Sequence, residues 1–237
     1  MALQCTPKFE LQSTVLLEVL LQLSIAYNAF SGTIPKELGN LKQLTMLSLG
    51  INNFSGSLPS ELGNLVDLTE IYIHSCGAGG EIPSTFANLT KIQTMWASDN
   101  PFTGKIPEFI GNWTDLTSLR FQGNSFEGPI PSSFAKLTSL TSLRITDLAN
   151  VSSNLGFIKD MKSLTYLSLR NALISDSIPS NIGEYNILKT LDLSFNNLTG
   201  QIPSALFNMT SLTYLFLGNN SLSGDLPSQK SDTLQNM

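Results

Sequence analysis

The sequence predicts an α/β solenoid, a curved right-handed array of stacked coils with a parallel sheet on its concave face and short helical or 3-10 turns on its convex face. Three observations predict this fold. One pattern returns at a constant interval, apolar residues alternate within each repeat, and the same Asn, Gly and Pro positions follow each alternation. A fixed period of this length indicates coils that bury one another's apolar stripes.

Nine blocks of equal length run without insertion or deletion, and each starts 24 positions after the one before. They start at residues 17, 41, 65, 89, 113, 137, 161, 185 and 209 and fill 17–232. Outside them lie an irregular N-terminal segment without a cap, 1–16, and a C-terminal tail, 233–237. Uncapped end repeats expose apolar faces, so we expect these two segments to be the least ordered parts of the chain.

Each block contains one short strand. The fourth, seventh and ninth positions are apolar, and the residues between the seventh and the ninth are polar or variable. This two-residue alternation is typical of a half-buried strand. The seventh position holds Leu23, Leu47, Ile71, Met95, Leu119, Leu143, Leu167, Leu191 and Leu215. Stacking the blocks therefore pairs nine strands into one parallel sheet.

The twelfth position predicts a column of buried asparagines. It holds Asn28, Asn52, Asn100, Asn124, Asn196 and Asn220. An amide both donates and accepts, so it can satisfy the peptide groups of the turn that follows each strand. Cys76 takes this place in the third block and is expected to be buried. Leu148 and Ala172 carry no amide, so we expect the hydrogen bonds of the column to stop between Asn124 and Asn196.

A bend and a helical turn complete each block. Gly at the sixteenth position suits a bend, and Pro at the nineteenth starts the turn. The sixth block, 137–160, departs most from this pattern, with Ser152 in place of Gly and Leu155 in place of Pro. It is either a decayed scaffold repeat or a loop shaped for a partner, and the sequence leaves both interpretations open.

Composition excludes several functional classes. The chain is 41% apolar and 13% charged, and its net charge of −5 argues against nucleic acid as a partner. Glu18 and Gln22 interrupt the Leu-rich N-terminal stretch, so neither a signal peptide nor a membrane span is predicted. Cys5, Cys76 and the single His74 predict no metal site, no disulfide framework and no cofactor. No set of catalytic residues is found.

Function is predicted on the concave face. The sixth, eighth, tenth and eleventh positions flank the buried strand residues and face the side on which solenoids bind partners. The predicted ligand-binding residues are Tyr72, His74, Trp96, Asp99, Arg120, Gln122, Arg144, Asp147 and Arg170. Aromatic residues and Arg are typical interface anchors. The alternative is a solvated strip with incidental charges.

Arg120 and Arg144 occupy the same position in adjacent blocks, about 5 Å apart at their origins. Like charges this close repel each other unless an anion or carboxylates offset them, and Asp99 and Asp147 lie at the neighbouring strand ends. Arg can hold a carboxylate by two parallel hydrogen bonds. We therefore hypothesise a site for an acidic or carboxylate-bearing peptide or a sugar acid.

Seven asparagines begin an N-x-S/T glycosylation signal. They are Asn53, Asn88, Asn112, Asn150, Asn197, Asn208 and Asn219. Such signals fit an extracellular surface. Three of them fall at the last position of a block, where the repeat pattern itself also explains them.

The block LKQLTMLSLGINNFSGSLPSELGN (41–64) resembles the plant-specific subclass of leucine-rich repeats, because of its repeated GxIP element. The segments EIPSTFANL, WASDNPFTGKIP and LRNALISDSIPSNIGEY are similar to one family of plant receptor-like serine/threonine kinases. In that family a malectin-like domain, a membrane helix and a cytosolic kinase follow the repeats. The resemblance implies a non-catalytic ectodomain that recognises a peptide, glycan or protein ligand, with or without a co-receptor, at the plasma membrane or in the cell wall space.

The chain also departs from that family. Its paired cap cysteines are missing, and no HRD or DFG motif of a kinase is present, so we expect a fragment or truncated relative that is not an enzyme. Two alternatives stay open. One is a soluble leucine-rich-repeat protein, such as an inhibitor of a secreted cell-wall-degrading enzyme; the other is a kinase only by way of domains absent from this sequence.

Overall fold

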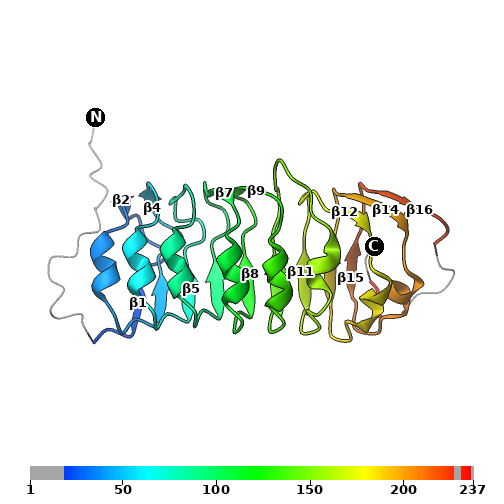
Figure 1. Ribbon diagram of the computed structural model, residues 1–237, viewed down its shortest axis with the longest axis horizontal. Helices are drawn as coiled ribbons and strands as arrows, with labels where there is room; N and C mark the ends of the chain where they lie inside the picture. The colour runs from blue at the N-terminus through cyan, green and yellow to red at the C-terminus, as the bar shows by residue number, and fades with distance from the viewer. Residues whose placement is uncertain (1–18, 227–230, 236–237) are drawn as a thin grey trace.

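The computed structural model describes residues 19–226 and 231–235 of the 237-residue chain. The expected disorder of 1–16 therefore falls outside the described residues, as does Cys5. Figure 1 shows the coils stacked side by side along the long axis of the molecule.

The described coils share one parallel sheet of nine strands. Its strands, in spatial order, are β1 (Gln22–Ser24), β3 (Met46–Ser48), β5 (Glu70–Tyr72), β6 (Thr94–Trp96), β8 (Ser118–Arg120), β10 (Ser142–Arg144), β11 (Tyr166–Ser168), β13 (Thr190–Asp192) and β15 (Tyr214–Phe216). Each residue pairs with its equivalent in the next block, as Leu23 does with Leu47. The predicted solenoid and its period are confirmed.

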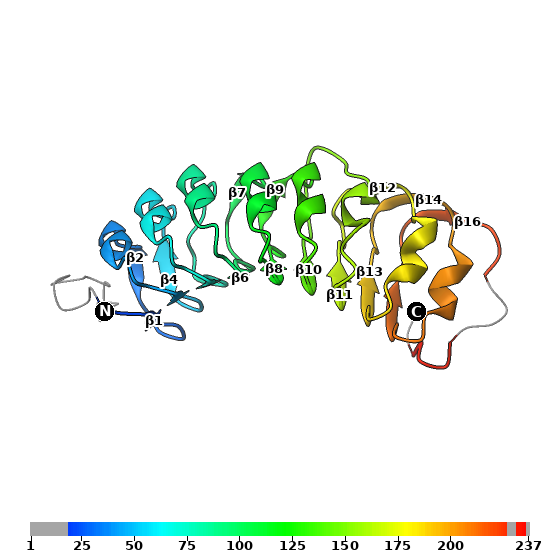
Figure 2. The same ribbon diagram turned by 60° about the horizontal axis from the view of Figure 1, so that its bottom comes forward.

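Eight 3-10 helices cover the opposite side of the described chain. They are η1 (Lys36–Asn40), η2 (Ser60–Asn64), η3 (Ser84–Asn88), η4 (Glu108–Asn112), η5 (Ser132–Lys136), η6 (Leu155–Ile158), η7 (Ser180–Glu184) and η8 (Ser204–Asn208). All except η6 follow a proline, whose fixed φ prepares the first turn. Figure 2 shows the helices along the outer side of the arc and the strands along its inner side.

Short strands on one flank were not predicted. They form the pairs β2 (Ser31–Thr33) with β4 (Asn53–Ser55), and β7 (Thr103–Lys105) with β9 (Ser125–Glu127), and the triplet β12 (Ser175–Ser177), β14 (Asn197–Gln201) and β16 (Ser221–Ser223). Paired residues on this flank, such as Ser31 and Asn53, are two positions closer in the sequence than paired residues in the concave sheet, such as Leu23 and Leu47. The sheets are interrupted at the third and sixth blocks. In the third block a Cβ on Gly77 would collide with the carbonyl oxygen of Phe54.

The asparagine column hydrogen-bonds the backbone N–H and C=O groups of the turns, as predicted. Asn196 donates to Leu169 O (2.7 Å) and Leu193 O (2.9 Å) and accepts the N–H groups of Ala172 (3.0 Å) and Ile174 (2.9 Å). One side chain thus joins its own coil to the preceding one. Leaving such buried groups unpaired costs about 1–3 kcal/mol each.

The column is interrupted where expected. Asn124 reaches back to Ala97 O (3.0 Å), and the next amide is Asn196. Leu148 and Ala172 fill the intervening places as buried apolar side chains. Cys76 is also fully buried, and burial raises the pKa of its thiol.

The third block keeps its turn closed without an amide of its own. Asn100 accepts the N–H groups of Cys76 (2.9 Å) and Gly77 (3.0 Å), and it donates to Ile73 O (2.7 Å). The amide of the following coil thereby satisfies the turn that Cys76 occupies. Cys76 belongs to the buried column by position, while Asn100 makes the hydrogen bonds.

The eleventh position adopts a left-handed backbone in every block, with φ between 50° and 69°. Its residues are Tyr27, Ile51, Ser75, Asp99, Gly123, Asp147, Asn171, Phe195 and Asn219. This conformation costs an L-residue other than Gly roughly 1–2 kcal/mol. The row, which we call the eleventh-position ridge, borders the concave sheet.

The sixth block and the C-terminal end complete the fold. Asn154 caps η6 by accepting the N–H of Gly156 (2.9 Å), the role that proline geometry has elsewhere. In the predicted tail, Leu234 is buried, and Gln235 N–H donates to Thr213 O (3.0 Å) as Thr213 N–H does to Lys189 O (2.8 Å). Residues 231–235 therefore pack like the start of another coil.

Candidate ligand-binding site on the concave face

Four neighbouring strands bring one row of large side chains together. Tyr72, Trp96, Arg120 and Arg144 end β5, β6, β8 and β10, and the strand register pairs each of them with the next. Alternation buries the residue before each of them, such as Leu119, and leaves the row half-buried on the solvent side. The regular strand register of the repeat positions all four side chains, without any contribution from an irregular loop.

Aromatic rings cover the faces of both guanidinium groups. The Cζ atom of Arg120 lies 3.6 Å from the ring centre of Trp96, and that of Arg144 lies 3.9 Å from the ring centre of Tyr166. Tyr72 packs edge-on against Trp96, with ring centres 5.0 Å apart. A cation over an aromatic face is stabilised electrostatically. One flat face of each guanidinium group is therefore covered by a ring.

Five polar atoms in this region are buried without a partner among the described residues. They are His74 Nδ1, Arg120 Nε, Gln122 Oε1, Ser142 Oγ and Arg144 Nε. Native proteins satisfy most buried polar atoms, so a cluster of unpaired ones calls for a ligand, water or ion. Outside this region, Trp113 Nε1 in the core is also unpaired among the described residues.

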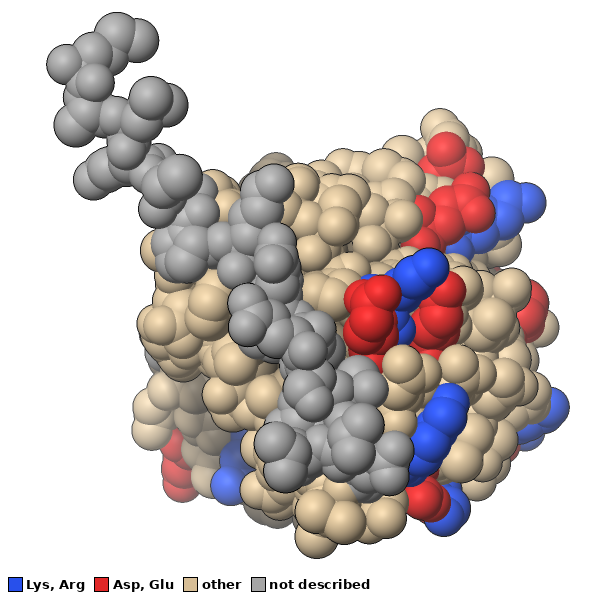
Figure 3. Space-filling view, turned by 90° about the vertical axis from the view of Figure 1, so that its left-hand side faces the viewer, with Lys and Arg blue, Asp and Glu red and all other residues tan. Residues whose placement is uncertain are grey.

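The two arginines carry uncompensated charge. Burial lowers the pKa of Arg120, and the neighbouring charge of Arg144 lowers it further. Among the described residues no carboxylate oxygen lies within 4.0 Å of either guanidinium group. Seen from the N-terminal end, by contrast, acidic and basic side chains lie beside each other on an otherwise uncharged surface (Figure 3).

The expected role of two aspartates is wrong. Asp99 and Asp147 were expected to offset the arginine charges, but both are exposed on the eleventh-position ridge and neither pairs with an Arg. Asp147 instead accepts hydrogen bonds from Thr146 Oγ1 (2.6 Å) and Asn171 Nδ2 (2.9 Å). The physical reason is the left-handed turn, which places both carboxylates at the strand ends, where Asp147 meets nearer donors.

Other predicted residues are placed as follows. His74 packs near Trp96, with ring centres 6.2 Å apart. Tyr72 donates its hydroxyl to Glu70 Oε2 (2.7 Å); burial and then this carboxylate raise the pKa of Tyr72 to about 12. Arg170 is exposed, and its Cζ atom lies 4.0 Å from the ring centre of Phe195.

Three residues at the sixth position were missing from the predicted site. Trp96 Nε1 donates to Ser118 Oγ (2.9 Å), Tyr166 covers Arg144, and Ser142 holds one of the unpaired atoms. The first two contacts are two positions shorter in sequence than the repeat, because the eighth side chain leans towards the sixth position of the next coil. Comparing each residue with the one 22 positions later, as well as with the one 24 positions later, would have identified these two contacts from the sequence.

The sequence profile of the Leucine Rich Repeat family matches residues 19–41, 43–65, 91–113, 115–137, 188–209 and 211–230, more than half of the chain. The chain belongs to the leucine-rich-repeat family. No curated protein matches this leucine-rich-repeat chain in a sequence search.

Solved structures extend the comparison. A TDR receptor is 33% identical and has a TM-score of 0.84 over 91% of this leucine-rich-repeat chain and 38% of its own. The Arabidopsis receptor kinase HAESA, solved with the peptide hormone IDA and the co-receptor SERK1, is 30% identical, with a TM-score of 0.79 over 92% of this chain and 41% of its own. The chain thus spans less than half of either structure. The predicted resemblance to plant receptor kinase ectodomains is confirmed for the repeats.

A third solved structure has another function. A plant ice-binding protein is 28% identical, with a TM-score of 0.73 over 90% of this leucine-rich-repeat chain and 70% of its own. The fold alone therefore does not determine function, and the side chains that the repeats display must be considered.

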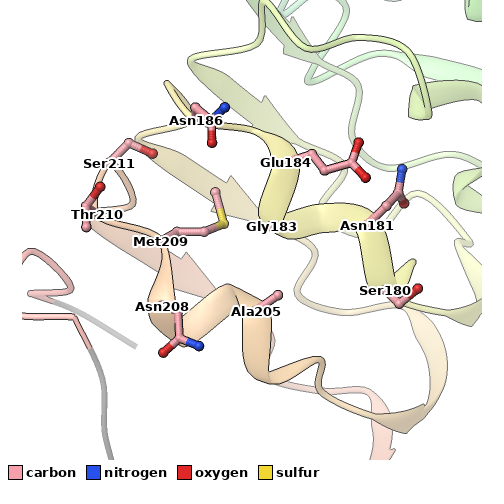
Figure 4. Close-up of a pocket in the computed structure, with 10 residues that line it drawn as sticks. All are labelled: Ser180, Asn181, Gly183, Glu184, Asn186, Ala205, Asn208, Met209, Thr210 and Ser211. Carbon is pink, nitrogen blue, oxygen red and sulfur yellow. The ribbon is translucent and has the colours of Figure 1, made fainter.

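The convex side of this leucine-rich-repeat chain offers a contrast. A hollow of about 420 Å³ lies between η7 and η8, lined mainly by short polar side chains such as Ser180, Asn181 and Ser211 (Figure 4). None of its lining residues holds a buried polar atom without a partner within the described part of the chain. This hollow therefore lacks the unpaired polar atoms found along the concave row.

The seven predicted glycosylation asparagines are all exposed. None occupies the sixth, eighth or tenth position of any block, so sugars there would leave the arginine row open. Their glycosylation stays a prediction. In the two described ranges no group of three His, Cys, Asp or Glu side chains could hold a metal ion, and none of the described helices has the length and apolar character to cross a membrane.

Proposed function

We propose that this leucine-rich-repeat chain is a non-catalytic recognition module that binds an extracellular ligand with an anionic group across the concave face of blocks three to seven. The observation that carries this proposal is the cluster of five buried, unpaired polar atoms around Arg120 and Arg144. A ligand carboxylate would accept from the N–H edges of the two guanidinium groups and offset their charges, and Gln122 Oε1 would accept from a donor of the ligand.

The chemistry favours an acidic group presented edge-on. A carboxylate accepts two parallel hydrogen bonds from one guanidinium edge, and such charge-assisted bonds are roughly twice as strong as neutral ones. The rings of Trp96 and Tyr166 hold the two guanidinium planes in place before the ligand arrives. Less side-chain freedom is then lost on binding.

The solved relatives support a peptide as the ligand. HAESA was solved with a peptide hormone and a co-receptor, and other similar plant receptors were solved with peptides. By this likeness we propose an extended peptide, an extracellular location and a signalling role with a protein co-receptor. A sugar acid, which carries the same carboxylate, is the second candidate for the arginine pair.

Trp96 provides a direct readout. The chain has two tryptophans, and Trp113 is fully buried in the core, so a Trp113→Phe background leaves Trp96 as the reporter. The probes are an acetylated, amidated Ser/Gly peptide with one central Asp, its Asn twin, and glucuronate. We expect the Asp peptide or glucuronate to change Trp96 fluorescence saturably and the Asn peptide to have little effect.

Two variants decide the location. Arg120→Ala with Arg144→Ala should weaken binding by about 2 kcal/mol or more, as removal of central anchors does. Ser24→Ala with Ser48→Ala, at the same position of the first two blocks, is the matched control and should change nothing. Undiminished binding by a folded double-arginine variant would overturn the proposed site and make the sixth block the next candidate.

A further inference from the structure

The eighth position changes chemical character along the solenoid. From the third to the ninth block it holds Tyr72, Trp96, Arg120, Arg144, Ser168, Asp192 and Phe216. An uncompensated positive pair is thus followed, two strands beyond Arg144, by a negative side chain and then by an aromatic one. A ligand that lies along this row meets charges of opposite sign in a fixed order.

Asp192 is the negative member of the row. Its Oδ1 atom accepts from Ser194 N–H (3.0 Å) and Ser194 Oγ (2.6 Å). Among the described residues no cationic nitrogen lies within 4.0 Å of its carboxylate. Arg170 approaches it only through the Ser194 hydroxyl, to which Nη1 donates at 3.4 Å. The half-buried carboxylate therefore lacks a direct cation.

Aromatic rings stand beside this carboxylate. Phe216 pairs with Asp192 in the strand register, and Tyr214 pairs with Thr190. Each of the two aromatic side chains is 39% exposed. A basic side chain can lay its apolar stem over such a ring and bring its charged end to the neighbouring carboxylate. The edge of the concave sheet at β13 and β15 thus fits a Lys or Arg side chain.

The spacing of the two charged regions fits an extended peptide. Neighbouring strands lie about 4.8 Å apart, so Asp192 is about 10 Å from Arg144 and about 14 Å from Arg120. An extended chain advances about 3.3 Å per residue, which corresponds to three or four residues. Ser168, which lies between the two regions, is small and buried and leaves the path clear.

We propose that the concave face selects a peptide by its order of charges, with an acidic residue over Arg120 and Arg144 and a basic residue, three or four positions away, over Asp192 and Phe216. This inference rests on the proposed function, because the acidic contact fixes the register of the peptide. It adds a second subsite that a singly charged peptide or a sugar acid does not fill.

The test uses acetylated, amidated Ser/Gly peptides with one Asp and one Arg separated by one to six positions. Each has a twin in which Gln replaces Arg. In the Trp113→Phe protein we expect the Arg peptide to bind roughly three- to fivefold more tightly than its twin at a separation of three or four, the size of a partly exposed ion pair. At a separation of one the twins should bind alike.

Asp192→Asn should abolish the advantage of Arg over Gln and leave the Gln twin unaffected, whereas Asp99→Asn, on the eleventh-position ridge, should preserve the advantage. Equal binding of the twins at every separation, with binding still dependent on Arg120 and Arg144, would overturn the charge-order inference alone. Loss of any dependence on the two arginines would overturn the proposed function instead. Equal effects of Asp192→Asn on both twins would show that Asp192 acts by holding Ser194 and Arg170.

Discussion

Two polar columns run through this solenoid, and they differ in what becomes of their hydrogen bonds. The asparagines inside the coils donate to and accept from peptide groups of their own coil and the preceding one, as Asn196 does. The arginines Arg120 and Arg144 repeat with the same spacing, yet their buried Nε atoms have no partner in the described chain. Repetition of a polar residue thus serves structure in the first column, and we propose that it serves recognition in the second.

The cause of the difference is where the partners come from. Every coil supplies the same backbone N–H and C=O groups at its turn, so an inward amide always meets a partner of matching geometry. On the concave face the neighbour of one guanidinium group is another guanidinium group or a ring, and neither can accept its N–H edge. Under the proposed function, another molecule completes this outward-facing column.

We expect the largest loss of stability from a substitution that removes an inner asparagine. Asn196→Leu removes the bonds to Leu169 O and Leu193 O and leaves the N–H groups of Ala172 and Ile174 unpaired. We expect the free energy of unfolding to fall by about 3 kcal/mol, measured by urea denaturation. The control is Asn28→Leu, whose exposed amide bonds its own coil within the described residues and should cost less than about 1 kcal/mol. Equal costs would show that the amides act locally and do not join coils.

A middle-sized effect is expected on the eleventh-position ridge, which lies between the two columns in each block. Ile51 is held at φ 54° with a branched side chain, so Ile51→Asn should stabilise the chain by about 0.5–1 kcal/mol. Gly123→Ala should have the opposite sign, because φ is 69° there and a Cβ would lie 2.5 Å from Asp99 Oδ1. Thermal unfolding of the two variants measures both; a loss of stability in Ile51→Asn would contradict the assigned strain.

A small effect is expected from an outer arginine in the absence of ligand. Arg120→Met removes a charge that burial and Arg144 disfavour, while its apolar body still covers Trp96. We expect the stability to change by less than about 0.5 kcal/mol or to increase, since such charges are kept for function. Urea denaturation without probe peptides checks this. A loss as large as that of Asn196→Leu would erase the distinction between the columns.

The smallest effect concerns alkaline pH. The pKa of Tyr72 is raised to about 12, whereas an unfolded tyrosine ionises near pH 10. Between these values the native state keeps a proton that the unfolded state releases, so stability falls as pH rises through this window. Tyr72→Phe should show a shallower fall in the urea midpoint above pH 10 than the parent chain. Parallel curves would mean that Tyr72 titrates normally.

The fold could be predicted from the sequence because the buried positions repeat at a constant interval without interruption. Leu23, Leu47 and Ile71 share a role that a constant period reveals directly. The short strands on the flank could not be predicted in this way. A segment such as Ser31–Thr33 has no apolar alternation, and its pairing follows from backbone that the neighbouring coils place beside it.

The positions of the concave row were predicted from the sequence, and its contacts were not. The concave row of Tyr72, Trp96, Arg120 and Arg144 followed from the strand pattern, which fixes the face that a residue points to. Its electrostatic partner did not follow, since a sequence position cannot show that Trp96, and not Asp99, lies over Arg120. The direction in which side chains lean between coils decides this, and it is visible only in the folded structure.

The oblique contacts between coils have a consequence for how such chains change by duplication. Scaffold contacts join equivalent positions, as Leu119 with Leu143, so copying or deleting a whole block restores each of them at the new junction. The contacts of Trp96 with Ser118 and of Arg144 with Tyr166 join the eighth position of one block to the sixth of the next. A new junction therefore creates new pairs of eighth- and sixth-position side chains, while the backbone contacts are unchanged. Gain or loss of one block can replace a binding site in a single genetic event.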